Sequence, residues 1–174
     1  PYVIANNPQS DDITGDLDGI VDQGESITLD LNLENVGIEV AEDVIVNITS
    51  TDPWISITNG SLSVGDINDG ISLTAQGFAF DVISGVEDGH VALFLVEITD
   101  VNGNVWNTQF NITLNAPKLE VLNLEVLDGG NGIMDSGENV DLVFEVANVG
   151  HDLAYMLENS IVITNPNLTI NNAT

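Results

Sequence analysis

The sequence predicts an all-β protein built of tandem immunoglobulin-like antiparallel β-sandwiches, the second of which is incomplete. Three observations support this fold class. Apolar and polar residues alternate with a period of two, as in half-buried strands. Turn-forming residues recur about every 8 to 12 residues, which is typical of a sandwich of about seven strands. Residues 15–61 also recur, without a gap, as residues 128–174, which indicates two copies of one module.

The repeat sets the domain boundaries. Residues 1–116 are expected to form one complete sandwich, and residues 117–174 the N-terminal half of a second, homologous sandwich. A short linker, Asn115-Ala116-Pro117, separates them. Because the second copy stops at the counterpart of Ser61, we expect the chain to belong to a longer protein whose neighbouring domains are its partners. The missing strands would then come from a neighbour, or that half would be partly disordered.

The expected strands follow from the alternation and from turn residues between them. His90–Ile98 is more continuously apolar than the others, so we expect it to be a central strand. Asp100–Asn104 is a hairpin turn, because Asn and Gly tolerate positive φ. In chain order the expected strands are Ile27–Leu33, Val44–Ile48, Ile55–Ile57, Phe78–Val82, His90–Ile98, Phe110–Leu114 and Leu119–Val126.

The composition excludes several classes of partner and chemistry. The net charge is −27, with 28 carboxylates against a single base, Lys118. Nucleic acids and anionic membranes bind through Lys and Arg, so neither is an expected partner. The absence of cysteine excludes disulfides and thiolate chemistry, and no apolar run approaches the ~18 residues that membrane insertion needs. So acidic a chain requires salt or divalent cations, which favours an extracellular, secreted or cell-surface location.

The first acidic loop is the candidate metal site. Calcium prefers six to eight oxygen ligands from carboxylates and carbonyls, at about 2.4 Å. A D-x-D-G sequence folds two carboxylates to one side, and its Gly permits the sharp turn. No helices flank the loop, so it is not an EF-hand. We predict a Ca²⁺ site formed by the carboxylates of Asp16, Asp18, Asp22 and Glu25 and the backbone carbonyl of Ile20.

The second loop repeats this pattern in part. Gly129 stands in place of Asp16, and Asn131 replaces Asp18. Asp128, Asn131, Asp135 and Glu138 form a second, weaker candidate calcium site. The alternative for both loops is an acidic turn that binds no metal, and the glycines Gly24 and Gly137 fit a turn that needs positive φ in either case.

Signals of catalysis are poor, so we expect that the chain is not an enzyme. His90 and His151 occupy non-equivalent positions in the two copies and are interpreted as turn or rim residues. No nucleophile-elbow Gly-x-Ser-x-Gly is present. Sugar stacking is an alternative role for the aromatic residues, but core or interdomain packing is favoured for them. These residues are Tyr2, Trp54, Trp106 and Tyr155.

The residues of the repeat resemble a known family. Gly-Ile-x-Asp-x-Gly-Glu, followed by an alternating strand, Asn-Val-Gly, Ala-x-x-Val and a turn ending in Asp/Asn-Pro, resembles the CARDB-like, immunoglobulin-like modules of secreted bacterial proteins. Such modules often accompany gingipain-like peptidases of Bacteroidetes. The resemblance implies a non-catalytic accessory module, used for spacing or adhesion, and favours calcium at the acidic loop. The alternative is a glycan- or protein-binding accessory module of an exported peptidase or other hydrolase.

Overall fold

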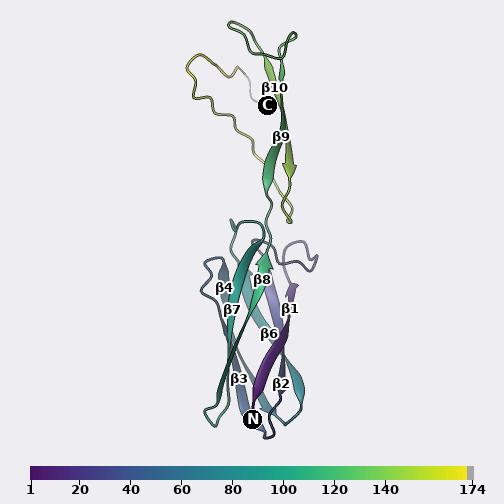
Figure 1. Cartoon of the computed structure of the whole chain (residues 1–174), viewed down its shortest axis with the longest axis vertical. Coiled ribbons are helices and arrows are strands. Elements are labelled where there is room, and N and C mark those ends of the chain that lie inside the picture. The colour runs from purple at the N-terminus through teal and green to yellow at the C-terminus, as the bar shows by residue number, and fades with distance from the viewer. Residues whose placement is uncertain (172–174) are drawn as a thin grey trace.

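The computed structural model describes residues 1–171 and confirms the all-β fold class (Figure 1). Eight strands form two four-stranded antiparallel sheets, with the strand orders β1-β2-β6-β4 and β5-β3-β7-β8. The remaining two strands, β9 and β10, pair with each other. The strands are β1 (Val3–Asp12), β2 (Ser26–Asn35), β3 (Ala41–Thr49), β4 (Ile55–Asn59), β5 (Ser61–Ile67), β6 (Ser72–Val82), β7 (His90–Thr99), β8 (Val105–Leu114), β9 (Leu119–Leu127) and β10 (Asp141–Asn148).

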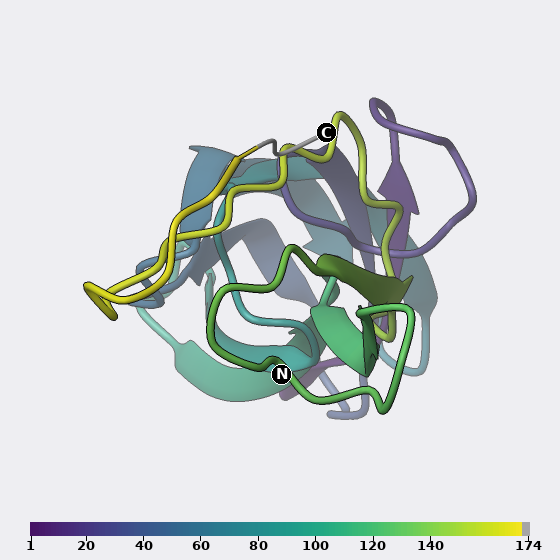
Figure 2. The ribbon, with the colours of Figure 1, turned by 90° about the horizontal axis from the view of Figure 1, so that it is seen from above.

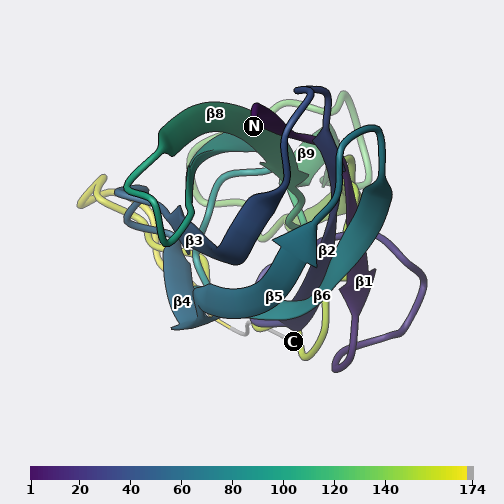
Figure 3. The same cartoon turned by 90° about the horizontal axis from the view of Figure 1, so that it is seen from below.

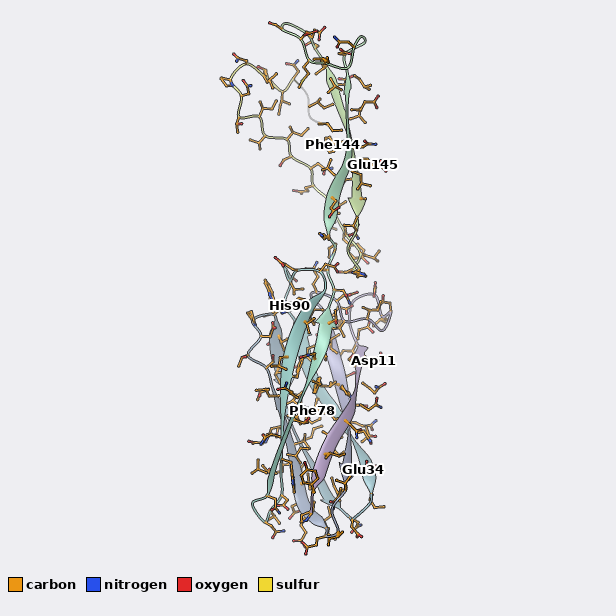
Figure 4. All side chains as sticks on the ribbon, viewed as in Figure 1. Asp11, Glu34, Phe78, His90, Phe144 and Glu145 are labelled. Carbon is orange, nitrogen blue, oxygen red and sulfur yellow. The ribbon has the colours of Figure 1, made fainter. Side chains whose placement is uncertain are left out.

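The core lies between the two sheets, which surround it when the molecule is seen end-on (Figure 3). Strand β2 buries every second residue, as its sequence predicts. Phe80 from one sheet meets Phe94 from the other with ring centroids 5.0 Å apart, and Phe94 stacks on Phe110 at 5.2 Å. The Phe80–Phe94 contact connects the two sheets through the centre of the sandwich, where Figure 4 also places Phe78, and the Phe94–Phe110 contact joins β7 and β8 within one sheet.

Strand β7 is central in its sheet, between β3 and β8, as expected. Its apolar sequence does not mean burial on both faces, however. Ala92, Phe94 and Val96 face the core, while Leu93 and Leu95 are exposed on the outer face. Since the sheet is one of two layers, only its inner face is covered. The predicted hairpin joins β7 to β8, and Asp100 Oδ1 accepts hydrogen bonds from the Asn102 and Asn104 amides at 3.0 and 2.9 Å.

Two strands of the sandwich are absent from the sequence prediction. Strand β1 contains Asn7 and Pro8, which are turn residues by composition. Its pairing with β2 is interrupted between Asn6 and Gln9, and Asn7 has a φ of 49°, as in a β-bulge. Strand β5 contains Gly65 at positive φ and register shifts opposite β3. Both strands break the alternation because bulges place extra residues in them.

In the described part of the second module the strands are the β9–β10 pair, which extends away from the sandwich (Figure 1). Residues 154–162, the counterpart of β3, are not in a strand. In the first module β3 is held by β5 and β7, whereas no strand pairs with residues 154–162 among the described residues. Residues 172–174, which belong to the predicted second module, lie outside the described residues. Among residues 1–171, no helix is long and apolar enough to span a bilayer.

The Asn-Val-Gly motif has the same structural role in both modules. Asn35 Oδ1 accepts hydrogen bonds from the amides of Tyr2 and Gly37, and its Nδ2 donates to two carbonyls. Asn148 Oδ1 likewise accepts from the amides of Lys118 and Gly150. A Cβ on either glycine would lie within 2.5 Å of the backbone of the module's first strand segment. The motif therefore fixes the start of each module to its second strand.

We expect Asn35→Ala to lower the free energy of unfolding of the sandwich by about 2 to 4 kcal/mol, because buried amides and carbonyls lose their partner. Urea unfolding followed by tryptophan fluorescence measures this, since both tryptophans lie in the sandwich. The matched control is Asn148→Ala, which removes the equivalent but exposed side chain. Equal losses in the two variants would contradict the prediction.

Candidate metal centre

The acidic loop between β1 and β2 lies at the end of the sandwich from which the chain continues into β9 (Figure 1). The Ile13 amide donates to the Ser26 carbonyl at 2.9 Å and closes the base of the loop. The Gln23 amide donates to the Asn115 carbonyl, and the Asn115 amide donates to the Val21 carbonyl, both at 3.0 Å. The loop is therefore bound directly to the linker between the modules.

One group of carboxylates is formed by Asp12, Asp16 and Glu25, each of which offers an oxygen within 4.8 Å of the other two. Two ligands on opposite sides of a calcium ion are separated by about 4.8 Å, twice the Ca–O distance of about 2.4 Å. Asp12 and Glu25 are only 6% and 4% exposed. Glu25 is also fixed by a hydrogen bond of 3.0 Å from the Asp22 amide to its Oε2.

A second group is formed by Asp16, Asp22 and Asp152, each of which likewise offers an oxygen within 4.8 Å of the other two. Asp152 belongs to the segment after β10, which passes over the end of the sandwich when seen from above (Figure 2). A cavity of about 510 Å³ separates the loop from this segment, and these three carboxylates are among its lining residues. The second group therefore combines residues of both modules.

Two buried carboxylate oxygens accept no hydrogen bond from the described residues. They are Asp12 Oδ2 and Asp22 Oδ1, on side chains that are 6% and 3% exposed. An unpaired buried carboxylate is costly unless a proton or a cation neutralises it. Asp12 belongs to the first group and Asp22 to the second. Both groups thus contain an acceptor that a bound cation would satisfy.

The electrostatics of the loop oppose ionisation in the absence of a cation. Burial, followed by the charges of Asp152 and Glu25, raises the pKa of Asp22 to about 6. Burial is also the main cause that raises the pKa values of Glu25 and Asp152. A divalent cation would have the opposite effect on these groups, because it favours the charged form.

The structure brings together only part of the predicted calcium ligands. Asp16, Asp22 and Glu25 belong to these groups, whereas the Asp18 carboxylate belongs to neither. The Ile20 carbonyl stays a prediction, because both groups consist of carboxylates alone. Asp18 Oδ1 instead accepts a hydrogen bond of 2.7 Å from the Ile20 amide and closes a local turn. The sequence analysis missed Asp12 and Asp152. Asp12 could have been found by aligning Pro1–Asp12 with Pro117–Asp128, whereas Asp152 has no local signal.

The second loop keeps the local hydrogen bonds of the first loop but contains no such group. The Asp135 amide donates to Glu138 Oε2 at 2.9 Å, as the Asp22 amide does to Glu25. Both side chains are exposed, however, and no metal-binding group forms there among the residues that the structure describes. Asn131 Oδ1 accepts from the Ile133 amide at 2.8 Å, which is the counterpart of the bond at Asp18.

A shorter loop explains the difference. Asp12 accepts a hydrogen bond from the amide seven residues later, that of Gly19, whereas Asp128 accepts one from Gly132, four residues later. The second loop therefore lacks three residues of the segment that carries Asp16. Asp128 is thus the counterpart of Asp12 and not of a residue beside Asp16. In the first loop Asp16 belongs to both groups of carboxylates. The second loop has no counterpart of Asp16, so its remaining carboxylates do not form such groups.

Other candidate residues have structural partners. His90 Nε2 lies 2.8 Å from Asp52 Oδ2, and His151 Nδ1 lies 2.9 Å from Asp88 Oδ2. Trp54 and Trp106 pack against the core, as favoured from the sequence. The two tyrosines differ from that expectation, because Tyr2 and Tyr155 are exposed.

No protein-family model and no curated protein matches the chain. Among solved structures, one that is similar is the archaellum periplasmic stator protein complex FlaF and FlaG from Sulfolobus acidocaldarius. The identity is 15%, the match covers 48% of this chain and 76% of that chain, and the TM-score is 0.27. A similarity this low carries no information about activity.

We expect Gly15→Ala to weaken calcium binding and to destabilise the loop. Gly15 has a φ of +97°, and a Cβ there would overlap the Glu25 carboxylate. Gly19→Ala is the matched control, because Gly19 also has positive φ (+84°) but open space around it. Calcium titration by calorimetry should show a larger loss of affinity for Gly15→Ala. Equal losses would mean that backbone strain alone is responsible.

In the presence of a chelator we expect stability to rise on acidification. The folded-state pKa of Asp22, about 6, exceeds its ordinary value of 3.8. The folded state therefore binds the proton more tightly, and this contribution to stability is lost as the pH rises through 6. Between pH 7 and pH 5, Asp22 should add about 1.4 kcal/mol to the free energy of unfolding. Urea unfolding in EGTA measures it, and an unchanged pH dependence in Asp22→Asn would contradict it.

Proposed function

We propose that this chain is a non-catalytic, extracellular β-sandwich repeat module, stabilised by Ca²⁺ at its first acidic loop. In this role it is a spacer or adhesion segment of a larger secreted or cell-surface protein. The observation that carries the proposal is the pair of buried, unpartnered oxygens, Asp12 Oδ2 and Asp22 Oδ1. The resemblance of the repeat to CARDB-like modules supports an accessory role beside other domains.

The ligand chemistry favours calcium over other metals. The two groups contain only Asp and Glu, whereas zinc sites are built mainly from the sulfur of Cys and the nitrogen of His. Mg²⁺ requires a near-ideal octahedron at about 2.1 Å and keeps most of its water. A set of several carboxylates with no other ligand type suits Ca²⁺, which takes six to eight oxygens in a flexible geometry. A cation held by several carboxylates in this way stabilises the loop and has no nucleophile beside it to activate.

The expected contribution to stability is large for a domain of this size. With a dissociation constant of about 10 μM and about 1 mM calcium, binding stabilises the folded state by about 2.7 kcal/mol. A domain of this size has a total stability of about 5 to 15 kcal/mol. The ion therefore takes the place of the disulfides that the cysteine-free chain lacks.

The alternative, a glycan-binding accessory module of an exported hydrolase, has less support. Sugar rings are usually stacked on exposed aromatic faces. Both tryptophans, Trp54 and Trp106, pack against the core, whereas the exposed aromatic candidates are the smaller rings of Tyr2 and Tyr155. The role as a calcium-stabilised spacer accounts for the buried, unpartnered oxygens of the loop, which sugar binding would not explain.

We expect 1 mM CaCl₂ to raise the melting temperature of the sandwich by about 10 °C relative to EGTA. The double variant Asp12→Asn, Asp22→Asn should lose this shift, because it removes the unpartnered oxygens of both groups. Asp135→Asn, at the exposed equivalent position of the second loop, should retain it. Thermal unfolding by circular dichroism measures the shift, with MgCl₂ as the control for charge screening. An equal shift in MgCl₂, or none in CaCl₂, would refute the proposal.

A further inference from the structure

We propose that the loop binds two calcium ions that share Asp16, and that the second ion connects the two modules. The first ion is held by Asp12, Asp16 and Glu25, and the second by Asp16, Asp22 and Asp152. This inference rests on the proposed function and adds to it the number of ions and the role of the second. The ion at the junction would fix the orientation of the β9–β10 module relative to the sandwich.

The geometry favours two ions over one. Asp12 and Asp152 belong to different groups, and only Asp16 belongs to both. A carboxylate can bridge two cations because each of its oxygens can bind one. The two groups together comprise five carboxylates, so two calcium ions would leave a net charge of about −1. A single ion would leave about −3 in a loop that is partly buried.

The unpartnered oxygens supply an independent observation for each ion. Asp12, whose Oδ2 has no partner, belongs to the first group, and Asp22, whose Oδ1 has no partner, belongs to the second. Both side chains are more than nine-tenths buried, so water does not compensate them freely. Each proposed ion therefore satisfies one buried oxygen that the described protein atoms leave without a hydrogen bond.

The direct contacts between the modules are few, which gives the second ion a structural effect. The His151 amide donates to Asp88 Oδ1 at 3.1 Å and to the Ala116 carbonyl at 3.2 Å. The His151 ring also meets Asp88, but its side chain is 71% exposed, and exposed pairs contribute little. These contacts bring the neighbouring Asp152 up to the loop, where it faces other carboxylates. Without a cation this approach is repulsive.

The stoichiometry of calcium binding tests the proposal on the full chain. Native mass spectrometry and calorimetry should find two ions in the unmodified protein and one in Asp152→Asn. The matched control, Glu158→Gln, removes a charge from the same segment outside both groups and should still bind two. Two ions in Asp152→Asn, or one ion in the unmodified protein, would overturn the inference. In the second case a retained melting shift would leave the proposed function intact, whereas no binding at all would refute both.

Trypsin provides a readout of the junction itself. Lys118 is the only Lys or Arg in the chain, and it lies at the junction with an exposed side chain. Cleavage requires local opening of the backbone. Calcium should therefore slow cleavage after Lys118 by about tenfold or more in the unmodified protein and in Glu158→Gln. In Asp152→Asn most of this protection should be lost. If calcium slowed cleavage equally in all three proteins, the proposal that an ion connects the modules would be wrong.

Discussion

The repulsion among the carboxylates at the β1–β2 loop is the constraint on which the rest of the structure depends. Asp12, Asp22 and Glu25 are buried although they carry the same charge, and the fold offers no internal cation to compensate them. Lys118, the single Lys or Arg of the chain, lies just before β9, and its Nζ is 3.4 Å from Glu120 Oε1. Compensation therefore comes from the solvent, as protons or as metal ions. The same loop is hydrogen-bonded to the linker at Asn115. A change in the conformation of the loop therefore acts directly on the junction between the modules.

Where local pattern determines structure, the sequence was a reliable guide. Strand β2 could be predicted because its alternation is uninterrupted, and the Asp100–Asn104 hairpin because its turn residues suit positive φ. The repeat also revealed real structural equivalence: Asn35 and Asn148 make matching hydrogen bonds, as do Glu25 and Glu138. Strands β1 and β5 were missed because a bulge changes the period of the pattern, and the sequence alone does not show which residues are extra.

The candidate site could be predicted only in part, since a metal centre depends on contacts between distant residues. Asp16, Asp22 and Glu25 lie within one loop and were found from their spacing. Asp152 enters only through the packing of the second module on the first, so no local pattern points to it. Asp18 has the residue type of a ligand, but its side chain closes a turn with the Ile20 amide. The second loop keeps the motif Gly-Ile-x-Asp-x-Gly-Glu yet lacks the three residues that would carry a bridging carboxylate. Motif identity therefore overstates the equivalence of the two loops.

The position of the terminal strands has a mechanical consequence. The N-terminus lies at one end of the sandwich, and the chain continues into β9 from the other end (Figure 1). Strands β1 and β8 run along the sandwich, paired with β2 and β7 respectively. A force applied through these two points loads both ladders in shear. Many hydrogen bonds must then break together, whereas in peeling they would break one after another. Such an arrangement resists extension, as the proposed role of a spacer would require.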